Sequence, residues 1–137
     1  SPVPKGDYTA VIVNSEIKTA KSGKGQFLAL EFEIVEGEYS NRKLFSNLNI
    51  KNANEKAQTI AQRELATVCR AVGKNTIQDS SEIHMKPMLI KVAIVERKDT
   101  KELKNEIKNY YPLQAQRNPI PPAIQNQNNA GGRTASF

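Results

Sequence analysis

Two neighbouring segments of the 137-residue chain alternate between apolar and polar side chains, and this pattern limits the fold more than any other feature. The segments are residues 27–34 and 42–50. The positions that share one apolar face in each are Leu28, Leu30, Phe32 and Ile34, then Leu44, Leu48 and Ile50. Successive side chains of a strand point to opposite faces. Both segments are therefore predicted to be strands with one buried and one outward face.

The apolar period changes after residue 53. From Asn54 onward the apolar positions recur every three or four residues, as on one stripe of a helix. They are Ala57, Ile60, Ala61, Leu65, Val68, Cys69 and Val72. Asn54 suits the N-cap, and Gly73 suits the left-handed residue that ends many helices. A helix is predicted between these two residues.

Three further segments have the composition of strands, namely residues 8–17, 88–97 and 105–111. Glycine-rich or polar turns separate the segments at 21–25, 37–41 and 98–101. The resulting order is strand-strand-strand-helix-strand-strand, which matches the five-stranded Greek-key barrel of the oligonucleotide/oligosaccharide-binding type, the OB-fold. We predict a mainly β chain with this OB-fold barrel and its helix between strands 3 and 4.

The end of the sequence differs in composition from the rest. Pro112 closes the last predicted strand, and the remainder is rich in Pro, Gln and Asn. Such a segment cannot bury enough apolar surface to offset its ordering entropy. We predict one domain at residues 1–112 and a disordered tail at 113–137.

The charge balance favours polyanionic partners. Lys and Arg number 20 against 14 acidic residues, for a formal net charge of +6. Summed positive surface charge attracts and holds phosphate. No apolar run is long enough to span a bilayer, and no signal segment opens the sequence, so no membrane partner is expected.

Aromatic residues on outward faces are the main binding candidates. Phe27 and Phe45 fall on the polar faces of the second and third predicted strands, which form the ligand face of this barrel type. Exposed aromatic rings stack on bases of any identity. Tyr110, in phase with Lys108 on the last strand, is a further stacking candidate. The alternative for each ring is burial beneath the helix or a loop.

Basic residues cluster near these rings and in two turns. The candidate phosphate contacts are Lys18, Lys21, Lys24, Lys43, Lys51, Arg97, Lys98, Lys101 and Lys108. The first and last turns flank the ligand groove in such barrels. Lys56, Arg63 and Arg70 form a basic edge on the predicted helix, which is either a solvated face or a surface that a strand wraps around.

Catalytic and metal-binding patterns are not found. His84 is the one histidine and Cys69 the one cysteine, so neither has a His or Cys partner for a zinc site. Cys69 lies on the apolar stripe of the helix and is read as a core thiol. We expect no catalytic residues, no metal, no cofactor and no enzyme activity.

Residues 6–13, 27–37 and 42–45 resemble a bacteriophage protein family, and residues 65–73, 86–92 and 105–112 continue the likeness. The family has been known as a domain of unknown function in phage replication and recombination gene clusters. Its members are similar to single-stranded DNA-binding proteins of the barrel type, with an aromatic residue at the position of Phe45. The resemblance implies sequence-tolerant binding of single-stranded DNA in phage replication or recombination, in the cytoplasm of the infected bacterial host.

Several alternatives stay open. RNA could replace DNA as the ligand, and phage recombination or replication proteins are candidate partners, as is a second copy of the chain. The main alternative function is a protein-interaction module that loads or restrains a recombinase. An oligosaccharide ligand is disfavoured because the chain is basic and contains no Trp.

Overall fold

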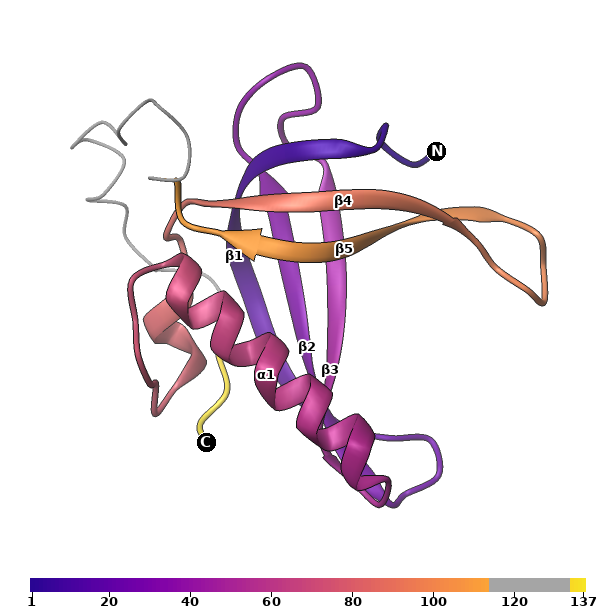
Figure 1. Cartoon of the computed structure of the whole chain (residues 1–137), viewed down its shortest axis with the longest axis vertical. Helices are drawn as coiled ribbons and strands as arrows, with labels where there is room; N and C mark the ends of the chain where they lie inside the picture. Colours follow the sequence, from indigo (N-terminus) through magenta and orange to yellow (C-terminus); the bar gives the residue numbers. More distant parts are fainter. Residues whose placement is uncertain (114–133) are drawn as a thin grey trace.

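The computed structural model describes residues 1–113 and 134–137, which form a five-stranded antiparallel sheet with one long helix (Figure 1). In chain order the elements are β1 (Gly6–Thr19), β2 (Gly25–Ile34), β3 (Lys43–Asn52), α1 (Glu55–Ala71), the 3-10 helix η1 (Ser80–Ile83), β4 (Met88–Glu96) and β5 (Leu103–Tyr111). The prediction of a mainly β chain with its helix between strands 3 and 4 is confirmed.

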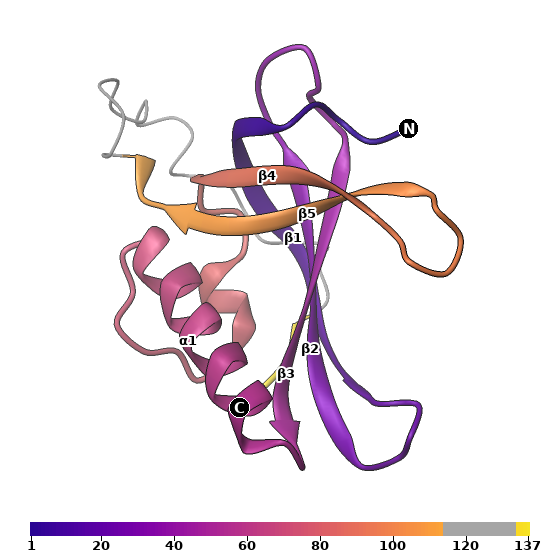
Figure 2. The same ribbon diagram turned by 45° about the vertical axis from the view of Figure 1, so that its right-hand side comes forward.

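The sheet is strongly bent. Its strand order is β3-β2-β1-β4-β5. β1, β2 and β3 run side by side, whereas β4 and β5 cross in front of them, and α1 lies on the same side as this crossing pair (Figures 1 and 2). Within the described residues no ladder joins β3 to β5, so main-chain hydrogen bonds do not close the sheet into the barrel that the element order predicted.

The core lies between the two parts of the bent sheet and follows the predicted alternation. The four inward residues of β2 are Leu28, Leu30, Phe32 and Ile34, each at most 1% exposed. Leu44 and Leu48 of β3 are also buried, and Ile50 packs against the core from its rim. The sequence pattern therefore identified the buried face of both strands.

A bulge in β5 changes the face of its last residues. Val92 of β4 pairs with Ile107, and Lys91 pairs with Asn109, so Lys108 is an extra residue without an opposite partner in the ladder. An extra residue resets the alternation of the strand that carries it. Ile107 and Tyr110, three positions apart, therefore both face the core. Tyr110 does not lie on the outward face to which simple alternation assigned it.

Helix α1 begins and ends as predicted. The Asn54 side chain accepts hydrogen bonds from the amides of Lys56 and Ala57 at 3.0 and 3.2 Å, and Gly73 has a φ of 80°. One predicted position of the apolar stripe is corrected, because Ile60 lies at its edge and is 57% exposed. On β4, Ile94 is 40% exposed, and the β4–β5 pair extends beyond the body of the sheet (Figure 1).

The hydroxyl of Tyr110 connects the open edges of the sheet to the helix. It donates to Oε2 of Glu64 on α1 at 2.6 Å, and Oγ of Ser46 on β3 donates to it at 3.0 Å. The Tyr110 ring stacks on Phe32 with centroids 5.8 Å apart. Side chains thus join β3, β5 and α1 where a main-chain ladder does not.

Residues 134–137 lie against the segment that precedes η1. The Ser80 amide donates to the Ala135 carbonyl at 2.7 Å, the Phe137 amide donates to the Gln78 carbonyl at 2.8 Å, and Asp79 and Ser136 form an antiparallel bridge. The sequence did not predict this contact. The predicted disorder of the tail falls mostly on residues 114–133, which lie outside the described residues.

We expect Tyr110→Phe to destabilise the protein while preserving the ring stack with Phe32. The change removes two hydrogen bonds, one to a carboxylate, and such bonds contribute about 1–3 kcal/mol. Urea denaturation with a fixed transition slope measures the loss. Tyr111→Phe is the matched control, expected to change stability by less than about 0.5 kcal/mol. Equal effects of both variants would contradict the bridging role of the Tyr110 hydroxyl.

Candidate nucleic-acid interface

The outer face of β1, β2 and β3 carries both predicted stacking phenylalanines and two of the predicted lysines, and the strand register fixes their neighbours. Lys18 on β1 pairs with Phe27 on β2. On β3, Phe45 pairs with Glu31 and Lys43 pairs with Glu33. Side chains of directly paired residues lie on the same face and within contact range. Both aromatic rings therefore share one face, each beside a charged residue.

The two rings differ in exposure. Phe45 is the most exposed of the large hydrophobic residues within the described ranges, at 63%, while Phe27 is half-buried. A bulge between the Gln26 and Leu28 pairs places two β3 residues opposite Phe27. Phe45 consequently offers a full ring face to a ligand, and Phe27 offers part of one.

Lys43 is held by carboxylates of the neighbouring strand. Its Nζ lies 2.6 Å from Oε1 of Glu33 and 3.6 Å from Oε2 of Glu31. The hydrogen bond to Glu33 is the main cause that raises the pKa of Lys43, with attraction to both carboxylates adding to it. A phosphate group would have to compete with these carboxylates for the ammonium group.

The β1–β2 loop forms a basic end of this face. Lys18, Lys21 and Lys24 are exposed there, and Lys51 at the end of β3 pairs with Gln26. No ion pair joins these four lysines to a carboxylate within the described part of the chain. They are the predicted phosphate contacts with the least competition from acidic groups.

Gly25 allows β3 to approach this loop closely. A Cβ atom at residue 25 would lie 2.7 Å from the Lys51 carbonyl oxygen, and the glycine has a φ of 150°. Any side chain would push the end of β3 away from the loop. The glycine thus keeps Lys51 next to the loop lysines.

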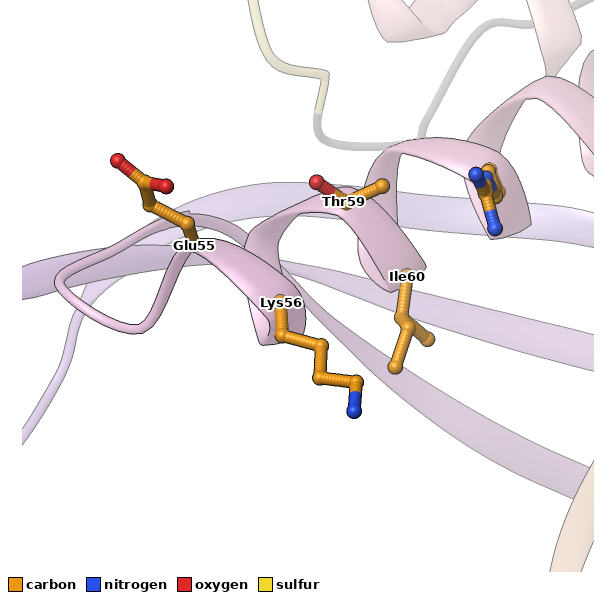
Figure 3. A pocket seen from close by; sticks show the side chains of 5 residues that line it. Glu55, Lys56, Thr59 and Ile60 are labelled. Atoms are coloured by element: carbon orange, nitrogen blue, oxygen red, sulfur yellow. The ribbon is translucent and has the colours of Figure 1, made fainter.

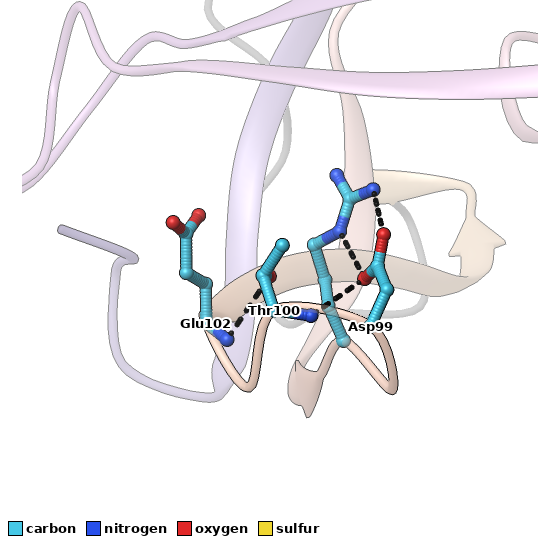
Figure 4. Close-up of polar contacts among 4 residues, drawn as sticks. Asp99, Thr100 and Glu102 are labelled. Carbon is cyan, nitrogen blue, oxygen red and sulfur yellow. Dashed lines mark hydrogen bonds and ion pairs between the residues drawn. The ribbon is translucent and has the colours of Figure 1, made fainter.

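The β4–β5 turn carries a second basic group at the far end of the projecting strand pair. Nε and an NH2 nitrogen of Arg97 each lie 3.2 Å from one oxygen of Asp99, whose Oδ1 also accepts from the Thr100 amide (Figure 4). These contacts lower the pKa of Asp99, the Arg97 hydrogen bond most of all. Arg97 therefore holds the turn together, whereas Lys98 and Lys101 extend into solvent.

Tyr110 and Lys108 do not join this face. Tyr110 is only 3% exposed, and burial raises the pKa of its hydroxyl group, with the Glu64 hydrogen bond as the second cause. Lys108 forms an ion pair of 2.6 Å with Glu106 beside a groove of about 330 Å³ between α1 and β5. A stacking role for Tyr110 is thus excluded by its burial.

The helix bears a shallow hollow of about 530 Å³ on its solvent side. Lys56, Ile60 and Arg63 line it, together with Glu55 and Thr59 (Figure 3). Two residues of the predicted basic edge thus flank an exposed apolar side chain. The three- and four-residue spacing of apolar positions does not predict this combination, because it places Ile60 on the buried stripe of the helix.

The described residues do not bring side chains of the kinds that bind metals together into a site. Residues 1–113 and 134–137 contain no group of three or more His, Cys, Asp or Glu that could hold a metal ion. Cys69 is buried, and burial raises the pKa of its thiol. No helix in the described ranges is long and apolar enough to cross a membrane.

Comparison with known proteins identifies a family. No curated protein matches the chain. A family model described as "Protein of unknown function (DUF669)" matches residues 1–122. The match spans most of the sequence and agrees with the resemblance to a domain family of unknown function. The chain belongs to the DUF669 family.

Proposed function

We propose that this protein binds single-stranded DNA without reading its sequence, and that it acts in bacteriophage DNA replication or recombination inside the host cell. The observation that carries the proposal is Phe45, an aromatic ring that is 63% exposed near the start of β3. A ring in this position stays in contact with water and gains few contacts within the fold. Stacking on a base supplies those contacts and tolerates any base.

The fold supports the same function. The strand order and the position of α1 agree with an OB-fold whose β3 and β5 edges are joined by side chains rather than by a ladder. In this fold the ligand lies on the outer face of strands 2 and 3, between the β1–β2 and β4–β5 loops. This agreement supports the proposal, because Phe45 lies on β3 and the basic residues lie in or next to the β1–β2 and β4–β5 loops.

The distribution of charge on the outer face of β1, β2 and β3 defines how a DNA strand would lie there. The four lysines at the β1–β2 end, Lys18, Lys21, Lys24 and Lys51, would contact phosphates. Glu31 and Glu33 are half-buried in the middle of the same face and repel phosphate there. A base stacked on Phe45 would therefore have its phosphate turned away from the sheet, and the backbone would approach the surface only further along, at the lysine end.

We expect the protein to bind single strands more tightly than duplex, with affinity falling as salt rises. If about four phosphates are neutralised, the log–log salt slope should be near −3, from about 0.7 per phosphate. Titration of a fluorescent oligothymidine at several salt concentrations measures the slope. A flat salt response, or equal affinity for duplex, would exclude this function.

Phe45→Ala should weaken binding by about 1–3 kcal/mol, with little preference among bases. Its stability should fall far less than the roughly 3–5 kcal/mol typical of a truncated buried Phe. The matched control is Phe137→Ala, since Phe137 is also an exposed phenylalanine, at 49%, but lies beside Gln78 rather than on the strand face. Normal binding by Phe45→Ala together with a large drop in stability would mean that the ring serves the fold.

Glu33→Gln should strengthen binding, because it releases Lys43 from its closest carboxylate and removes a repelling charge. One additional phosphate contact makes the log–log salt slope steeper by about 0.7. Glu38→Gln removes the same charge from the exposed β2–β3 turn and serves as the control. If the two variants change the DNA affinity and the salt slope equally, Lys43 does not contact the DNA strand.

A further inference from the structure

A buried hydrogen-bond chain links β1, η1 and residues 134–137, and the proposed function does not use it. Ser15 and Ser80 are fully buried, and His84 is 2% exposed. Oγ of Ser15 lies 2.6 Å from Nε2 of His84 and is also hydrogen-bonded to Oγ of Ser80. The amide of Ala135 donates to Oγ of Ser80 at 2.5 Å. The chain of contacts thus runs from the Ala135 main chain to an imidazole.

One order of donors along this chain joins the docked segment to a neutral imidazole. An amide nitrogen can only donate, so Oγ of Ser80 accepts from Ala135. The chain continues in one direction if Ser80 donates to Ser15 and Ser15 donates to Nε2 of His84. In this order Nε2 carries no proton, so the imidazole is neutral.

Protonation of His84 disturbs that arrangement in two ways. Nε2 would become a donor, so the hydrogen bond with Ser15 would reverse. The new charge would also be buried, which is costly without full pairing or hydration. Burial is accordingly the main cause that lowers the pKa of His84 below its usual 6.5, and attraction to Asp79 offsets it in part. Other ionisable groups on the surrounding segments are Glu16, Cys69, Glu82 and Lys86.

Residues 134–137 are the part of this cluster that can open at least cost. Ser15 lies within the long ladder between β1 and β2. The Asp79 capping box fixes η1, and His84 forms a bridge with Ile12. Residues 134–137 have one isolated bridge and a few hydrogen bonds to Gln78, Asp79 and Ser80. Local opening occurs first where few contacts hold a segment.

We propose that residues 134–137 form a latch that stays docked on Gln78–Ser80 while His84 is neutral and is released when His84 takes up a proton. Release lets water reach the imidazolium through the space that Ala135 fills. The surface that the latch covers fits an extended segment with a small residue at the buried position and a hydroxyl residue next to Asp79, whose carboxylate accepts from Ser136 at 2.8 Å.

The sign of the pH effect follows from the lowered pKa of His84. The docked state prefers neutral His84, so the latch is strongest above the imidazole's ordinary pKa of 6.5 and weakens as the pH falls below it. Docking weakens no further once the pH is below the pKa that His84 has while residues 134–137 are docked. Each pKa unit between the docked and released states weakens docking about tenfold.

Nuclear magnetic resonance of the full chain, titrated from about pH 8 to about pH 5, tests the latch. His84 is the one histidine of the sequence, so its imidazole signal is unambiguous. We expect the amide signals of Ala135 and Phe137 to move from docked to unstructured positions with the midpoint of the His84 titration. Amides that stay docked through that titration, or that are already undocked at the highest pH, would overturn the proposal.

Two variants sharpen the test. In His84→Gln the amide oxygen accepts from Ser15 and does not titrate, so the latch should stay docked throughout. Ser80→Ala removes the acceptor of the Ala135 amide and should undock the latch at every pH. A pH-dependent release that persists in His84→Gln would refute the mechanism, because the Asp79 carboxyl titrates at a pKa of about 2, below the tested range. If His84→Gln does not fold, the coincidence of midpoints in the unmodified chain decides.

Discussion

The contact between Tyr110 and Phe32 is the one on which the rest of the structure depends. A bent sheet with two free edges exposes its core at the gap between those edges. Tyr110 fills this gap with its ring, and its hydroxyl engages Ser46 on one edge and Glu64 on the helix. Placing the tyrosine there requires the extra residue at Lys108, which turns both Ile107 and Tyr110 inward. The bulge and the hydrogen bonds together replace the ladder that would otherwise close the sheet.

This solution leaves the outer face free for a ligand. The side chains that join β3 to β5 lie on the inner face of the sheet. Phe45 lies on the outer face, and its ring remains open to solvent. Gly25 holds the end of β3 against the β1–β2 loop, so Lys51 stays with the loop lysines. The features that close the core thus also position the ring and the cations of the candidate site.

The sequence predicted the mainly β chain, the helix between strands 3 and 4 and the outward position of Phe45, but not the open sheet, and its failures have identifiable causes. Alternation located the buried residues of β2, and the caps located α1 to within two residues. Tyr110 was misassigned because a bulge leaves no sign in a pattern of period two. The ion pairs of Lys43 depend on cross-strand register, which alternation alone does not give. Ala135 is a small residue without periodic neighbours, so nothing in the sequence marked it for burial.

The arrangement of charge on the outer face argues for a flexible ligand over a rigid one. A duplex carries two backbones at fixed spacing, so laying it across β1, β2 and β3 would bring phosphates over Glu31 and Glu33. In the proposed complex a single strand would rotate about its backbone bonds, so that a base stacks on Phe45 while its phosphate turns away from Glu31 and Glu33. The carboxylates would then act as a selective element, because they penalise only a ligand that cannot move its phosphates away. Holding Lys43 in an ion pair would serve the same purpose, since it removes a cation from the part of the face where a duplex backbone would pass.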